Sequence, residues 1–116
     1  MADKPHKAPE PEAAALIKTA EAKMLQAEMA RGPHRDVLYS EAKDALLCAE
    51  QLDAGSGAWK LSCISARLGQ EKLCKRWLER ARKRGTLPGR DTIEKSPYFA
   101  ESRKLAWFKQ FLKSLR

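Results

Sequence analysis

The chain has 116 residues, enough for one domain with a modest core, and its 23 Lys and Arg against 15 Asp and Glu give a net charge of +8. Valine occurs once, isoleucine and threonine three times each and alanine eighteen times, so the β-branched residues that a sheet requires are scarce. The longest unbroken apolar runs, such as Ala13 to Ile17, are too short to span a membrane, and no signal peptide is visible in MADKPHKAPEPE. We therefore expect an all-α protein of the cytoplasm.

The charge is unevenly distributed along the chain. Residues 1–57 carry 7 basic and 10 acidic side chains, whereas residues 58–116 carry 16 basic and 5 acidic ones. The net charges of the two parts are therefore −3 and +11. A basic half of this kind favours an acidic protein partner, nucleic acid or an anionic surface.

The N-terminal residues predict a tail followed by a helix. Residues 1–10 are rich in Pro, Lys and Glu, a composition typical of disorder. Pro11 suits the first position of a helix that runs to about Ala30, with Glu10 and Glu12 at the end that the helix dipole favours for negative charge. The apolar stripe of this helix is Ala13, Ile17, Ala20, Met24 and Ala27.

A second helix follows a Gly-Pro break. Gly32 and Pro33 should interrupt the chain, and Asp36 is the expected N-cap of the next helix. The apolar face of that helix is Leu38, Ala42, Ala45, Leu46, Ala49 and Leu52. The turn Asp53–Gly57 then contains Ser56, the expected N-cap of the third helix.

Residues 58–81 predict two short helices joined at Gly69. Apolar residues recur at three- and four-residue steps on both sides of that glycine. Gly69 supplies the positive φ that ends the first helix, and Gly85 with Pro88 ends the second. Helices this short have to pack antiparallel and then against neighbours to bury their stripes.

After Pro88 the pattern changes. Residues 90–95 predict a short helical turn, and Ser96-Pro97 predicts the start of another. Residues 104–115 predict an amphipathic helix that covers the last hairpin. Its apolar face is Phe108, Phe111, Leu112 and Leu115.

The spacing of small and large residues in the middle of the chain resembles the tetratricopeptide repeat, a helix–turn–helix unit of about 34 residues. One small-large-small ladder is Ala42, Leu46 and Ala49, and a second is Cys74, Leu78 and Ala81. Leu61 and Gly69 take the family's leucine and turn-glycine positions, and Pro88 closes the unit. The tail from Ser96 onward is similar to the segment that often closes short bacterial repeat proteins.

The resemblance implies a right-handed superhelical array of antiparallel helix hairpins. The two repeats would span 11–54 and 55–88, and residues 89–116 would form a C-terminal helical cap of the same domain. It also implies a non-catalytic adaptor or scaffold, which holds a peptide or helix of another protein in a concave groove. Because two repeats are few for this architecture, either the cap or a second copy of the chain must complete the core.

The first helix of each hairpin lines the groove in this family. The groove positions carry over onto Trp59, Lys60, Cys63, Ala66 and Arg67. Lys60 and Arg67 lie seven residues apart on one side of a helix, so they would suit an acidic peptide. In the alternative interpretation, Trp59 would pack against the preceding hairpin instead of contacting a partner, and Lys60 and Arg67 would lie on a solvated face. The asparagine-and-lysine clamp with which some members grip chaperone C-termini is not present.

Two other binding interpretations remain open. Five cations on one helix, Arg76, Arg80, Arg82, Lys83 and Arg84, would attract phosphate and suggest nucleic-acid binding, although no aromatic residues alternate with them as in a stacking platform. The aromatic residues of the last helix, amid Lys and Arg, would suit an anionic membrane surface, but the buried face of a cap explains them better.

The sequence shows no pattern typical of an enzyme, a metal site or a bound cofactor. His6 and His34 lie in polar, proline-containing segments, away from any catalytic or metal-binding spacing. Cys48, Cys63 and Cys74 form no CxxC pair, so small core residues are the simplest interpretation for all three. A redox pair of Cys63 with Cys74 across the hairpin is the alternative.

Overall fold

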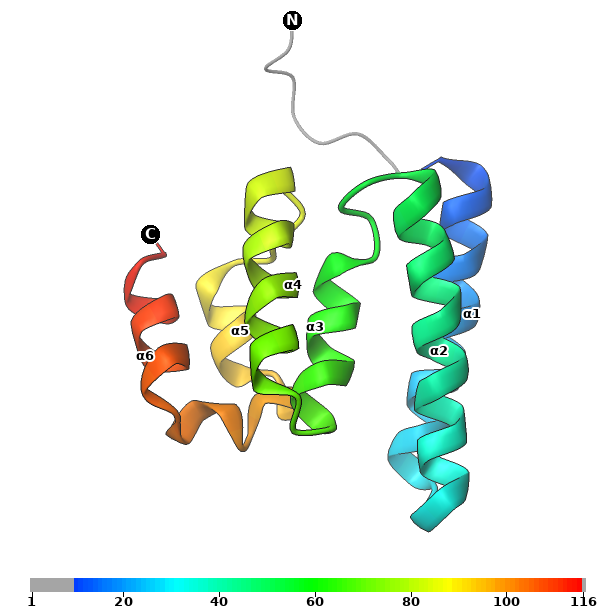
Figure 1. Ribbon diagram of the computed structural model, residues 1–116, viewed down its shortest axis with the longest axis horizontal. Helices are drawn as coiled ribbons and strands as arrows, with labels where there is room; N and C mark the ends of the chain where they lie inside the picture. The colour runs from blue at the N-terminus through cyan, green and yellow to red at the C-terminus, as the bar shows by residue number, and fades with distance from the viewer. Residues whose placement is uncertain (1–9, 116) are drawn as a thin grey trace, which may run out of the picture.

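The structure, a computed structural model, describes residues 10–115 and is all-helical over that range (Figure 1). Most of the tail expected at residues 1–10 lies outside the described residues; Glu10 is the exception. The described chain contains no strand. Its elements are α1 (Pro11–Met29), α2 (Gly32–Leu52), α3 (Ala58–Arg67), α4 (Glu71–Arg84), α5 (Arg90–Lys95), the 3-10 turns η1 (Pro97–Phe99) and η2 (Ser102–Lys104), and α6 (Ala106–Lys113).

The helices form two consecutive hairpins, α1 with α2 and α3 with α4, followed by a C-terminal segment (Figure 1). The small residues of both ladders are almost completely buried, which lets the helix axes approach closely. One continuous apolar cluster runs from α1 through both hairpins to α6. The C-terminal segment therefore shares the core of the hairpins.

The helix ends follow local chemistry, although not every predicted cap is correct. The Glu10 carboxylate accepts a hydrogen bond from the amide of Ala13 at 2.9 Å and so caps α1. The prediction that Asp36 is the N-cap of α2 is wrong, because α2 already begins at Gly32. Gly32 turns the chain with a φ of 59°, and Pro33 is tolerated in the first turn, where no amide hydrogen is needed.

The turn between the hairpins is held by Glu50 rather than by the predicted cap. Ser56 does not cap α3; its hydroxyl donates to the backbone oxygen of Ala49 at 3.2 Å. The buried Glu50 carboxylate instead accepts hydrogen bonds from the amides of Gly55 and Gly57, at 2.7 and 2.9 Å. It also forms an ion pair with Arg80 of α4. One side chain therefore joins the end of α2, the turn and the second hairpin.

The C-terminal segment adopts the predicted sequence of short helices. Gly69 and Gly85 have positive φ angles of 75° and 77°, as expected for helix-ending glycines, and α5 occupies residues 90–95. Ser96 caps η1 through its hydroxyl, which accepts from the amide of Tyr98 at 3.3 Å. The last helix begins at Ala106, later than predicted, because the turn η2 precedes it.

Stacked aromatic rings attach the C-terminal segment to the hairpins. Phe99 lies between Trp59 and Phe108, with ring centroids 5.5 and 5.2 Å apart, and Trp107 meets Phe108 edge-on at 5.6 Å. Phe108, Phe111 and Leu112 are buried, as predicted for a covering helix. This attachment brings α5 and η1 alongside α3.

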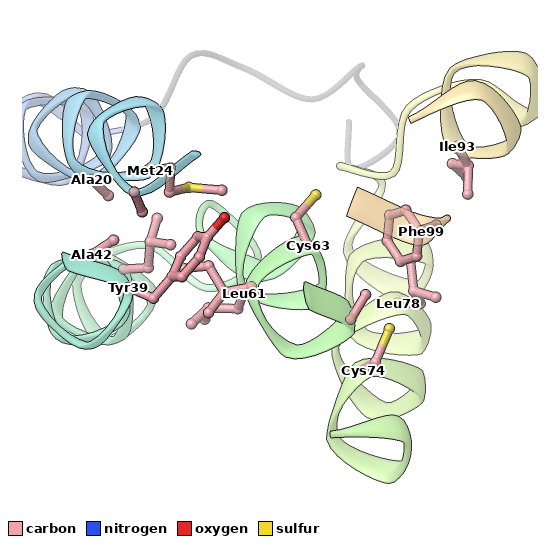
Figure 2. Packing of buried hydrophobic residues seen from close by; sticks show 14 of the residues in the cluster. Ala20, Met24, Tyr39, Ala42, Leu61, Cys63, Cys74, Leu78, Ile93 and Phe99 are labelled. Atoms are coloured by element: carbon pink, nitrogen blue, oxygen red, sulfur yellow. The ribbon is translucent and has the colours of Figure 1, made fainter. Parts of the chain in front are cut away.

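Seen along the helices, the fold has two sides with α3 between them. Figure 2 shows α1 and α5 on one side of α3, and α2 and α4 on the other. Each side carries a cavity, described below. Within residues 10–115, no helix combines the length and the hydrophobicity that crossing a bilayer requires.

Candidate interaction groove

A groove of about 580 Å³ lies between α1, α3 and the α5–η1 segment. Helix α3 supplies Trp59, Lys60 and Cys63, three of the predicted groove residues. The other lining residues are Glu21, Met24 and Leu25 of α1 and Thr92, Lys95, Ser96, Pro97 and Tyr98 of the C-terminal segment. Three separate parts of the chain thus form the walls.

The α1 wall carries exposed apolar side chains. Leu25 lines the groove and is 67 % exposed; Met29, one turn further along α1, is 82 % exposed. Leu25 and Met29 are spaced by four residues and therefore share one helix face. Apolar side chains this exposed, next to a concave surface, are typical of an interaction site.

The predicted groove cations are paired with carboxylates of the same chain. Lys60 lies 3.2 Å from Glu21, and Arg67 lies 2.5 Å from Glu28. Both pairs join α3 to α1, and in each pair the two residues are 39 positions apart in the sequence. Because this separation stays the same along the two helices, α1 and α3 run parallel. Lys60 and Arg67 therefore face the groove side of α3, where they contact carboxylates of α1.

Arg67 does not line the groove, but it contacts two residues that do, Pro97 and Tyr98. Its guanidinium donates to the backbone oxygen of Pro97 at 3.1 Å and lies 5.0 Å from the ring centre of Tyr98. With the Glu28 pair, this one side chain contacts α1 and η1 from α3. Burial, together with the nearby Glu28, raises the pKa of Tyr98, so its phenol stays neutral beside the arginine.

The remaining predicted groove residues are less accessible. Trp59 is half-buried and stacks on Phe99 of the C-terminal segment. Cys63 is 3 % exposed and Ala66 is buried. Of the predicted set, Trp59 and Lys60 thus offer the most surface to a bound segment.

The cysteines differ in environment. Cys48 is exposed on α2, so the prediction that all three are core residues is wrong for it; its place on the outer face of an amphipathic helix explains this. Burial raises the pKa of Cys63 to about 12, and burial, with Cys63 and Glu71 nearby, raises that of Cys74 to about 12. Both therefore stay protonated at neutral pH, which does not favour the redox interpretation.

The basic residues of α4 are divided between internal contacts and solvent. Arg80 pairs with Glu50, and Arg82 donates to the Ser114 hydroxyl at 2.7 Å and lies over the Phe111 ring. Arg76, Lys83 and Arg84 are exposed. Two of the five cations are thus held by internal contacts, although their side chains remain partly exposed.

Residues 10–115 contain no group of three or more His, Cys, Asp or Glu side chains arranged to hold a metal ion. His34 is exposed near the start of α2, and His6 lies outside the described residues.

Sequence reasoning missed the contribution of α1 and of the C-terminal segment to the groove. The signal for α1 was available, because Leu25 and Met29 are apolar residues off the buried stripe of their helix. No comparable signal marked Lys95 or Pro97, since their position depends on how the C-terminal segment attaches. Comparison of the chain with known protein families, curated proteins and solved structures finds no match.

Proposed function

We propose that this chain is a non-catalytic interaction module that holds a segment of a partner protein in the groove between α1, α3 and α5–η1. The observation that carries the proposal is the exposed apolar face of α1, where Leu25 lines the groove and Met29 lies one turn beyond it. Exposing apolar side chains to water is unfavourable in free energy, and a partner's apolar side chains would cover them.

The proposed architecture is that of a short tetratricopeptide-type superhelix. Two features support it: the buried ladders recur at the same spacing in both hairpins, and α1, α3 and α5 together line one groove. Parallel first helices, joined by the Glu21–Lys60 and Glu28–Arg67 pairs, fit the same arrangement. In this proposal the C-terminal segment supplies the third wall as well as the cap.

The charge of the groove suggests the chemistry of the partner segment. Because Lys60 and Arg67 already contact carboxylates, an acidic segment would meet Lys95, which is exposed and has no ion pair among residues 10–115. The net charge of +8 would also attract an acidic segment over longer distances. We therefore propose a partner segment with apolar side chains flanked by a carboxylate.

Selection of peptides from a random displayed library tests this function. The expected result is a set of apolar and acidic sequences whose affinity falls by about tenfold or more with Leu25→Glu plus Met29→Glu. Val37→Glu is the matched control, since Val37 is 52 % exposed on α2 and does not line the groove. Selected peptides that bind the Leu25/Met29 variant as well as the wild-type chain would contradict the proposal.

A further inference from the structure

A second cavity, of about 970 Å³, lies on the opposite side of α3, between α2 and α4. This is the side on which Figure 2 places those two helices. Its lining comes from the end of α2 and the following turn, and from α4: Leu47, Glu50, Gln51, Ala54, Leu73, Lys75, Arg76, Trp77, Glu79 and Arg80. None of these residues lines the first groove.

The floor of the second cavity is neutral and fixed. The Glu50 carboxylate is 7 % exposed, and its oxygens are occupied by the two turn amides and by Arg80. Charged groups that are already paired and hydrogen-bonded within the protein form few further interactions with a ligand. Recognition therefore depends on the walls and the rim.

The walls are apolar. Leu47 of α2 is 36 % exposed, and Leu73 and Trp77 of α4 face it from a half-buried position. Leu52, beyond the cavity at the end of α2, adds a further exposed apolar side chain. Two helices that flank α3 and line one cavity with apolar side chains are suited to an amphipathic helix.

The rim is positively charged. Lys75 and Arg76 line the cavity, are exposed, and take part in no ion pair among the described residues. Lys72, one turn before Arg76 on α4, is also exposed. The carboxylate on this part of the rim, Glu79, lies 4.0 Å from Arg82. An occupant that complements this rim is acidic.

We propose that the α2–α4 cavity is a second docking surface, which binds an acidic amphipathic helix of another protein. The apolar walls would take the apolar stripe of that helix, and Lys75 and Arg76 would contact carboxylates on its flanks. Nucleic acid fits less well, because it offers no apolar stripe and Arg80 and Arg82 are held by internal contacts. A second copy of this chain would bring its own net charge of +8 against the same cations.

A synthetic peptide is a direct probe of this surface. It has about 18 residues, leucines at i, i+3, i+4 and i+7, and glutamates at the other exposed positions; a scrambled peptide of the same composition is the control. Binding is measured by fluorescence anisotropy at about 50 and 200 mM salt. Amide chemical shifts locate the bound peptide on the protein.

The expected result is binding of the amphipathic peptide but not of the scrambled one, with shifts confined to α2 and α4. Leu47→Gln and Arg76→Glu should each weaken binding by about tenfold. Their matched controls, Val37→Gln and Lys18→Glu, change similarly exposed residues outside both cavities and should leave the affinity unchanged. Thermal unfolding of each variant shows whether the fold is intact.

Four results would overturn the proposal. Equal binding of the scrambled peptide would mean attraction by charge alone. Shifts along the first groove, with loss of binding in Leu25→Glu rather than Leu47→Gln, would place the peptide there. Tighter binding of single-stranded RNA, lost in Arg76→Glu, would assign the surface to nucleic acid. Concentration-dependent dimerisation abolished by Leu47→Gln would assign it to a second copy. Apart from the second result, none of these depends on whether the first groove binds a peptide.

Discussion

The Glu50 carboxylate provides the most direct test of how the two hairpins are joined. It accepts hydrogen bonds from the amides of Gly55 and Gly57 and pairs with Arg80. Glu50→Ala would remove all three contacts at once. The two glycines are buried, so water does not replace the lost acceptor without opening the turn.

The magnitude follows from those two amides. A buried N–H group left without a partner costs about 1–3 kcal/mol, so two of them cost about 4 kcal/mol at the centre of that range. Arg80 is partly exposed and regains water, so it adds little. With 116 residues and about 2.1 cal/mol/K of unfolding entropy per residue, 4 kcal/mol lowers the Tm by roughly 16 °C.

Urea and thermal unfolding followed by circular dichroism measure the change. Glu50→Gln keeps one acceptor oxygen and should lose about half as much free energy of unfolding, about 2 kcal/mol. Glu79→Ala removes an exposed carboxylate from α4 and is the control, with a change within about 0.5 kcal/mol. A loss below about 1 kcal/mol in Glu50→Ala would refute the role assigned to this carboxylate.

Further predictions concern the tight turn and the cysteines. Gly57→Ala should lower the free energy of unfolding by about 1–3 kcal/mol, because its Cβ would lie 2.8 Å from a backbone oxygen of α2, whereas Gly89→Ala, which meets open space, should change it by about 0.5 kcal/mol or less in urea titrations. In native alkylation at about pH 8 read by mass spectrometry, Cys48 should react while Cys63 and Cys74 are protected, and equal labelling of all three would contradict their burial. Folding raises the pKa of both buried thiols from 9.0 to about 12, so between pH 9 and 12 the folded state binds more protons than the unfolded state. The free energy of unfolding should therefore fall as the pH increases from 9 to 12. In the double variant Cys63→Ala plus Cys74→Ala, it should fall less steeply.

Local patterns in the sequence were sufficient to predict much of the helical fold. The three- and four-residue spacing identified the buried ladder residues, and the glycines at 69 and 85 identified two helix ends. The predicted start of α2 was wrong because proline is compatible both with a helix break and with the first turn of a helix. Sequence spacing alone does not distinguish these two cases.

The groove was only partly predictable, because most of its contacts join residues far apart in the chain. The α3 residues were identified from the family resemblance, but the partners of Lys60 and Arg67 lie about two helices earlier, on α1. The role of Glu50 was missed for the same reason: a glutamate near the end of an amphipathic helix is usually solvated. Only the folded turn brings the two glycine amides to it.

From α3, Arg67 contacts both α1 and η1, and this affects how the protein can be divided into fragments. A fragment that stops before α5 would retain both hairpins but would lack the residues from Thr92 to Tyr98 that complete the groove. Shortening the chain should therefore abolish the proposed binding before it abolishes helicity. Point substitutions, rather than truncations, are the appropriate tools for testing the proposed groove.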